Sequence, residues 1–86
     1  MIYKADLSDE FLKIAKKLKK KDYTTFVRLQ SKIEEILTNP EHYKPLKGGM
    51  KGLRRAHPGS FVIIFKIEKD YVRFVTFKHH DEAYRG

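Results

Sequence analysis

The stretch that decides the fold is KPLKGGMKGLRRAHPGSFVIIFKIEKDYVRFVTFKHHDEAY, which runs from Lys44 to Tyr84. Residues 40–52, which lead into this stretch and form its first part, are rich in proline and glycine and predict a loop. Residues 53–57 predict a short strand, and the apolar run over residues 60–67 predicts a strand in the centre of its sheet, because both of its faces are apolar. Lys69-Asp70 fits a tight hairpin turn, after which residues 71–77 predict a last strand.

The residues before this stretch predict a first strand over residues 2–5 and two amphipathic helices. Ser8 is a candidate N-cap of the first helix, whose apolar residues recur at helical spacing over residues 11–18. Asp22 is a candidate cap of the second helix, which carries an apolar stripe over residues 26–37. A short basic turn is expected between the helices, so that they fold back on each other as a hairpin.

Together these elements predict an α+β fold in the order β-α-α-β-β-β, as a single domain over residues 1–86. We expect the helical hairpin to pack on one face of a mostly antiparallel four-stranded sheet, because the apolar stripes of the helices have no other surface to cover. The opposite face is then left for a partner. In a chain this short we expect a shallow groove on that face and no deep internal cavity.

Strand alternation gives residues 53–57 two different faces. Leu53, Arg55 and His57 share one face, whereas Arg54 and Ala56 share the other. One of these faces meets the helices and the other can meet a substrate. The sequence alone does not decide which face is which, so both arginines stay candidates for the site.

The composition narrows the classes of partner and of chemistry. The 86 residues carry 19 lysines and arginines against 11 acidic residues, a formal charge of +8, which predicts a polyanionic partner such as nucleic acid. A lysine-rich solvated surface is the alternative explanation. The absence of cysteine excludes disulfides and cysteine-ligated zinc. Without a signal-peptide pattern or an apolar run of about 20 residues, we expect a cytoplasmic protein that does not enter a membrane.

The stretch also contains the residue types that cut RNA without a metal ion. RNA supplies its own nucleophile, the 2′-hydroxyl, so the protein needs a base for its proton, an acid for the leaving 5′-oxygen and cations for the charged intermediate. Histidine suits the first two tasks because its ordinary pKa is about 6.5, and arginine and lysine suit the third. The candidate residues are His57, His79, His80, Arg54, Arg55, Lys47, Lys51, Lys78 and Tyr84.

A metal site is not expected in this chain. His79 and His80 are adjacent, so in a strand they point to opposite faces and do not ligate one ion together. No acidic cluster has the spacing of a metal-dependent hydrolase, and the sequence contains neither a phosphate-binding glycine loop nor a nucleophile elbow. We therefore predict no metal and no other cofactor.

Three segments resemble the RelE/ParE toxin superfamily, and most closely its YafQ-like branch. The first is PLKG followed by KGLRRAH, which ends at His57; the second is the apolar strand over residues 61–65; the third is HDEAY, from His80 to Tyr84. The predicted order of helices and strands is also that of the superfamily, so the resemblance covers nearly the whole chain. The histidine-containing strand and the tail are its more specific parts.

The resemblance implies the toxin of a toxin–antitoxin pair, an endoribonuclease that cuts mRNA in the ribosomal A site without a metal ion and so inhibits translation. It also implies a small acidic antitoxin as the protein partner. The implied catalytic residues are His57, His80, Tyr84 and Arg54, and the RNA-binding residues assigned beside them are Lys47, Lys51, Arg55, Lys78 and His79.

Two positions depart from the family pattern. Ser60 stands near the place where the YafQ-like branch carries an acidic residue, and Val62 stands where the RelE-like branch carries an arginine early in the central strand. A second hypothesis therefore stays open: a non-catalytic ParE-like inhibitor of a partner such as DNA gyrase, or a degenerate RNA-binding member. The histidines separate the two hypotheses, because an inhibitor without chemistry needs no pair of histidines beside a basic groove.

Overall fold

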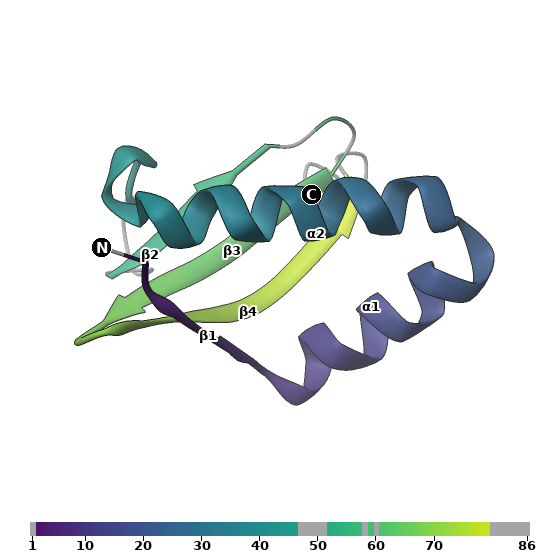
Figure 1. Cartoon of the computed structure of the whole chain (residues 1–86), viewed down its shortest axis with the longest axis horizontal. Helices are drawn as coiled ribbons and strands as arrows, with labels where there is room; N and C mark the ends of the chain where they lie inside the picture. Colours follow the sequence, from purple (N-terminus) through teal and green to yellow (C-terminus); the bar gives the residue numbers. More distant parts are fainter. Residues whose placement is uncertain (1, 47–51, 58, 60, 80–86) are drawn as a thin grey trace.

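The computed structural model describes residues 2–46, 52–57, 59 and 61–79 of the chain. Its helices and strands follow the predicted order β-α-α-β-β-β, with one additional short 3-10 helix before the second strand (Figure 1). The elements are β1 (Lys4–Leu7), α1 (Asp9–Lys21), α2 (Tyr23–Thr38), η1 (Pro40–His42), β2 (Leu53–Ala56), β3 (Phe61–Glu68) and β4 (Tyr71–His79).

The strands form one four-stranded sheet in the order β1-β4-β3-β2. β3 pairs antiparallel with both β2 and β4, whereas β1 pairs with β4 in parallel. The sheet is therefore mostly antiparallel, as predicted, and β3 has a neighbour on each edge, as expected of a strand that is apolar on both faces. The segment before β2 covers part of its outer edge, since the Leu46 N–H donates to the Leu53 carbonyl over 2.8 Å.

The β3–β4 hairpin contains a one-residue bulge. Phe65 pairs with Phe74, but Ile64 pairs with Thr76, so that Val75 is left as an extra residue on β4. Because successive strand residues point to opposite faces, one extra residue exchanges the faces of all residues beyond it. The bulge therefore decides which residues at the end of β4 meet the helices and which do not.

Both helices begin at the predicted capping residues. The Ser8 hydroxyl oxygen accepts a hydrogen bond from the Phe11 N–H over 3.0 Å, and the same hydroxyl donates to the Val75 carbonyl over 2.6 Å. The Asp22 carboxylate accepts from the Thr25 N–H over 3.1 Å. These bonds satisfy N–H groups that have no partner within the helix. Ser8 also ties the start of α1 to the bulge in β4.

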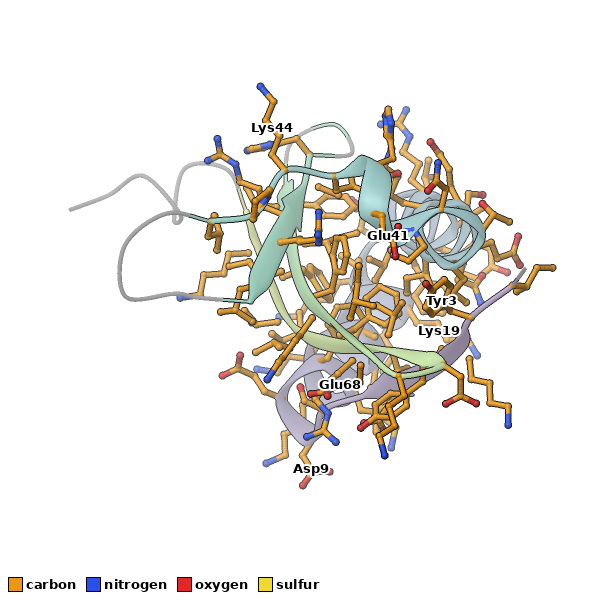
Figure 2. The ribbon with its side chains drawn as sticks, turned by 90° about the vertical axis from the view of Figure 1, so that its left-hand side faces the viewer. Tyr3, Asp9, Lys19, Glu41, Lys44 and Glu68 are labelled. Atoms are coloured by element: carbon orange, nitrogen blue, oxygen red, sulfur yellow. The ribbon has the colours of Figure 1, made fainter. Side chains whose placement is uncertain are left out.

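The two helices cover one face of the sheet and enclose an aromatic core. Phe11 of α1 packs against Phe74 and Phe77 of β4, with ring centroids 5.6 and 5.0 Å apart, and Phe65 lies 6.1 Å from Phe74. Figure 2, turned by 90° from Figure 1, shows α2 nearly end-on at one side of the strands. The other members of the buried cluster are Leu29, Ile36, Ala56, Phe61, Ile63 and Val72.

Two predictions about the N-terminal half were wrong. The first strand begins at Lys4 and not at residue 2, because the Tyr3 N–H donates to the Leu37 carbonyl at the end of α2 over 2.9 Å and not to the sheet. No basic turn separates the helices: the lysines up to Lys21 belong to α1, and Asp22 alone joins it to α2. Lysine is a good helix former, and cations are favourable near the C-terminal end of a helix.

Two predictions about the C-terminal half also need correction. The residues after α2 are not all loop, since η1 forms there with Pro40 at its start. β4 does not end at Phe77, because Lys78 and His79 pair with the first residues of β3. Residues 78 and 79, which lie beyond the strand predicted over residues 71–77, therefore belong to the sheet. Among the residues described, no helix has the length and apolar character needed to cross a membrane.

Candidate functional site

The two faces of the sheet are distinguished by the partners of β2. Arg54 and Ala56 pair with Phe65 and Ile63, which both belong to the core beneath the helices. The predicted alternation along β2 is therefore confirmed, and the open face is the one that carries the exposed residue Arg55. His57 follows directly after β2, is also exposed, and falls on this open side by the same alternation.

Arg54 binds backbone carbonyls on the covered side of the sheet. Its guanidinium group donates to the Tyr43 carbonyl over 2.6 Å and to the Glu41 carbonyl over 3.4 Å. These carbonyls belong to the segment that follows α2, so Arg54 holds this segment against the edge of β2. Arg54, predicted to be catalytic, thus lies on the opposite side of the sheet from Arg55 and His57.

Cross-strand pairs define two rows of residues on the open face. In the first row Arg55 pairs with Ile64, which in turn pairs with Thr76. In the second row Val62 pairs with Lys78. Neighbouring strands are about 4.8 Å apart, so the side chains of β2 and β4 flank a strip about 10 Å wide above β3. A phosphate group above β3 is within reach of long side chains from either flank.

Ion pairs divide this open face into two parts. Near β1, the Arg73 side chain lies 3.0 Å from the Asp6 carboxylate, and a second pair forms along β3 with a distance of 3.4 Å. At the other end, the exposed side chains of Arg55 and Lys78 form no ion pair within the part of the chain that the structure describes. Within the described ranges, the cations of this face that lack an ion pair are therefore Arg55 and Lys78.

Thr76 lies in the floor of this strip and was not predicted to belong to a site. The residue is 8% exposed, and among the described residues it has the only buried side-chain polar atom without a hydrogen-bond partner. Leaving a buried hydroxyl unpaired costs about 1–3 kcal/mol. The Thr76 hydroxyl is thus a polar group, in the same row as Arg55, that can still accept or donate a hydrogen bond.

The remaining predicted site residues are only partly covered by the described ranges. For His79 the backbone is described, and it pairs with Phe61 at the end of β4. The catalytic role that the resemblance implies for His80 stays a prediction. Within the described ranges, no three histidine or acidic side chains come close enough to hold a metal ion. The predicted site residues outside the described ranges are Lys47, Lys51, His80 and Tyr84.

The bulge at Val75 determines the position of Lys78, and its signal is present in the sequence. Without the bulge, the hairpin register would pair Lys78 with Phe61 and place it on the covered face. The core residues of β4 are Val72, Phe74 and Phe77, and the change from a spacing of two residues to a spacing of three marks the bulge.

Comparison with known proteins identifies the class of this chain. Residues 3–84 match the family of ParE toxins of type II toxin–antitoxin systems. RelE4 of Methanocaldococcus jannaschii, whose name designates it a candidate toxin, is 36% identical over 98% of this chain and 93% of its own length. The chain therefore belongs to the ParE toxin family of type II toxin–antitoxin systems, within the RelE/ParE superfamily.

Solved structures share the fold. A chain of the toxin–antitoxin complex RelBE2 from Mycobacterium tuberculosis has a TM-score of 0.81 and 16% identity, over 92% of this chain and 99% of that chain. A chain of the Escherichia coli DinJ–YafQ complex has a TM-score of 0.74 and 24% identity, over 100% of both chains. At these identities the likeness shows the fold alone, and it confirms the RelE-like architecture predicted from the sequence.

Proposed function

We propose that this chain is a toxin that inhibits translation by cutting mRNA in the ribosomal A site, by acid–base chemistry that needs no metal ion. Its family membership supports the toxin class. The observation that carries the proposal is the group formed by His57, Arg55 and Lys78 on the face that the helices leave open. A histidine that shares this face with two cations lacking ion pairs in the described ranges suits a phosphodiester substrate.

The proposed reaction is an attack by the 2′-oxygen of one nucleotide on the adjacent phosphorus. A base removes the proton of the 2′-hydroxyl as the new oxygen–phosphorus bond forms. An acid gives a proton to the 5′-oxygen as its bond to phosphorus breaks, which leaves a 2′,3′-cyclic phosphate and a free 5′-hydroxyl. His57 takes one of these two roles, and each such group is worth about 10²–10⁴-fold in rate.

The cations of the proposed site come from β2 and β4. Arg55, and not Arg54, contacts the phosphate in this proposal, because the Arg54 guanidinium is bound to backbone carbonyls on the covered side. Lys78 takes the place of the arginine that RelE-like toxins carry where Val62 stands here. Val62 and Lys78 are a cross-strand pair, and directly paired residues lie about 5 Å apart, so a cation stays available one strand further along the sheet.

The C-terminal tail completes the proposed site. His80 supplies the second acid–base group, and Tyr84 stacks on a nucleotide or orients it. Residues 80–86 are mostly polar or charged in sequence, so we expect the fold to persist without them, with a melting temperature close to that of the parent. Translation inhibition should fall tenfold or more, whereas Tyr84→Phe should have a mild effect. A truncated toxin that stays folded and equally active would show that the tail is not part of the site.

Further RNA contacts are assigned to Lys47, Lys51 and His79.

We propose a small acidic antitoxin as the protein partner of this chain. The formal charge of +8 favours an acidic partner. The RelBE2 and DinJ–YafQ structures that share this fold are toxin–antitoxin complexes. A partly disordered acidic segment that folds on binding can cover a large basic surface, which suits an inhibitor that must hold its toxin inactive.

A second candidate function is the non-catalytic inhibition of a partner such as DNA gyrase. The match to the family named for the ParE toxin of the parDE system favours it. The two candidates make different demands on His57, since only an acid–base mechanism requires a titratable side chain there. A supercoiling assay and an mRNA cleavage assay on the same preparation therefore separate them.

The deciding experiment is primer extension on mRNA in a translating extract. We expect the parent protein to create new 5′ ends within codons, and His57→Ala to reduce their rate of formation by about 10²-fold or more. His42→Ala is the matched control, because His42 lies in η1, is exposed and stands outside the proposed site. Intact mRNA together with inhibited supercoiling would instead establish the second candidate.

A further inference from the structure

A second surface of unusual composition lies between α1 and the end of the β3–β4 hairpin. It is a groove of about 800 Å³, open to solvent. Its sides carry Lys13, Lys17 and Lys21 of α1 and Lys78 of β4, with Glu10 as the acidic residue at the N-terminal end of the helix. The groove is therefore strongly positive, and it shares Lys78 with the strip above β3.

The three lysines of α1 form a regular row. They are spaced four residues apart, which places them on one side of the helix with about 6 Å between successive positions. All three are exposed, and none has an ion pair within the described ranges. Three cations left together in this way repel one another, so a row of carboxylates at matching spacing would relieve the repulsion and add ion pairs.

The floor of the groove is apolar, which favours a protein over a nucleic acid. Ile14 and Leu18 of α1 are partly exposed in it, and Phe61 and Phe77 close its base. The two phenylalanines are only 3% and 6% exposed, so their rings are not free to stack on bases as the aromatic rings of single-strand binding proteins do. Aliphatic side chains between lysines instead match the apolar stripe and acidic flank of an amphipathic helix.

From this composition we infer that the groove is the docking site for an acidic amphipathic helix of the antitoxin. The inference rests on the proposed function for the identity of its partner. Apolar side chains of the helix cover Ile14 and Leu18, while glutamates spaced four residues apart pair with the lysine row.

Lys78 connects this groove to the proposed catalytic strip. It lines the groove, and it also pairs with Val62 in the second row of the open face. A carboxylate of the docked helix that binds the Lys78 ammonium group competes with a phosphate for the same cation. Docking in the groove would therefore weaken substrate binding without covering the strip, which gives the antitoxin a direct means of inhibition.

The test uses a designed helical peptide of about 20 residues as the probe, with leucines on one face and glutamates four residues apart beside them. Its binding to the parent protein is followed by fluorescence anisotropy. The groove variant is Lys13→Gln, Lys17→Gln and Lys21→Gln together. The matched control is Lys16→Gln, Lys19→Gln and Lys20→Gln, which removes the same charge from other sides of the same helix.

We expect the groove variant to bind the peptide about tenfold more weakly, since three exposed ion pairs are each worth roughly twofold. The control should lose less than threefold, and a shuffled peptide of the same composition should bind weakly to all proteins. Equal losses in the two variants would show only non-specific charge attraction and overturn the inference. The inference would also be overturned if the groove variant lost affinity for a 20-nucleotide poly(U) RNA but not for the peptide.

The same proteins separate this inference from the proposed function. In the translating extract, the peptide should inhibit mRNA cleavage by the parent at least tenfold more strongly than cleavage by the groove variant, each measured against its own rate without peptide. If no protein cuts mRNA, the proposed function fails while the binding assay still decides the groove. If cleavage occurs but the peptide inhibits both proteins equally, the groove is not the docking site.

Discussion

The covered and open faces of the sheet are built from alternate residues of the same strands, but they differ in the apolar or charged character of those residues. From β3, the covered face receives Phe61, Ile63 and Phe65, none more than 3% exposed. On β2 and β4 the open face carries Arg55 and Lys78. The covered face provides the packing that stabilises the fold, which leaves the open face free to carry charges that do not stabilise it.

The clearest instance of this difference is a pair of neighbouring arginines. Arg54 and Arg55 are adjacent in the chain, yet one donates to two backbone carbonyls and the other is exposed without an ion pair in the described ranges. For a residue in a strand, the face of the sheet on which its side chain lies therefore indicates its role better than its residue type does. Substitutions matched across the two faces can separate stability from activity.

The largest effect is expected in the core. Phe65→Ala removes ring contacts to Tyr43 and Phe74, at centroid distances of 5.7 and 6.1 Å, and should lower the free energy of unfolding by about 3–5 kcal/mol. Ile64→Ala, the neighbour on the open face, is half-buried and should cost less than half as much. Urea denaturation of both variants measures the difference. Equal losses would mean that the open face is packed as tightly as the covered one.

The next largest effects are expected from substitutions of the two arginines of β2, which should affect different properties. Arg55→Gln should reduce mRNA cleavage tenfold or more, while the free energy of unfolding changes by less than about 0.5 kcal/mol. Arg54→Gln should instead lower the free energy of unfolding by about 1–3 kcal/mol, because two carbonyls lose a charged donor. Primer extension and urea denaturation on each variant provide the two readouts. A stable but inactive Arg54→Gln protein would restore Arg54 to the catalytic residues.

Ser8→Ala tests whether the open face depends on a contact made at the covered side. The substitution removes both the helix cap and the bond to the Val75 carbonyl, and we expect a loss of about 1–2 kcal/mol. Asp22→Ala, at the cap of α2, is the comparison. Amide chemical shifts should change around Thr76 and Lys78 in the first variant but not in the second. Unchanged shifts in both would show that the bulge holds without Ser8.

A smaller effect of opposite sign is expected at Thr76. Replacing its unpaired hydroxyl by a methyl group, in Thr76→Val, should raise the free energy of unfolding by about 1 kcal/mol and the melting temperature by about 4–8 °C. If the hydroxyl contacts the substrate, cleavage falls while stability rises. A drop in melting temperature would show that the hydroxyl has a partner in the folded protein.

The smallest effect depends on pH and concerns Lys32 at the rim of the covered side. Burial lowers the pKa of Lys32, but hydrogen bonds with Tyr43 and Glu35 outweigh it, so the pKa lies above its ordinary value of 10.5. The protonated form is thus favoured in the folded state, and its contribution is complete below pH 10.5 and lost as the pH rises through the folded-state pKa. Lys32→Met should be slightly less stable than the parent at pH 8, with a difference that shrinks above pH 10.5. A constant difference would exclude the charge as its cause.

The sequence predicts the features of this fold that depend on neighbours in the chain. Ser8 and Asp22 cap the helices because a side-chain oxygen at a helix start needs only the next few N–H groups. The two faces of β2 follow from alternation alone. The order of elements follows because amphipathic helices and apolar strands have few ways to cover one another.

The features that escape such prediction depend on contacts between distant segments. Arg54 is held by carbonyls of Glu41 and Tyr43, which no local pattern brings to it. The register beyond Val75 follows from the bulge and its bond to Ser8 near the other end of the chain. Alternation therefore grouped Arg55 with His57 without deciding which face was open, whereas Lys78 could reach the open face only through the bulge.

The parallel pairing of β1 with β4 also determines when the sheet can form during synthesis of the chain. β1 is the first strand to be synthesised, yet Lys4 pairs with Tyr71, in the last strand. Contacts so distant in sequence form late, and a ribosome adds only about 5–20 residues per second. The sheet, and with it the strip between Arg55 and Lys78, is completed only after β4, over Tyr71–His79, has been made. On the proposed function, a nascent chain therefore cannot cut mRNA before its ribosome has translated past residue 79.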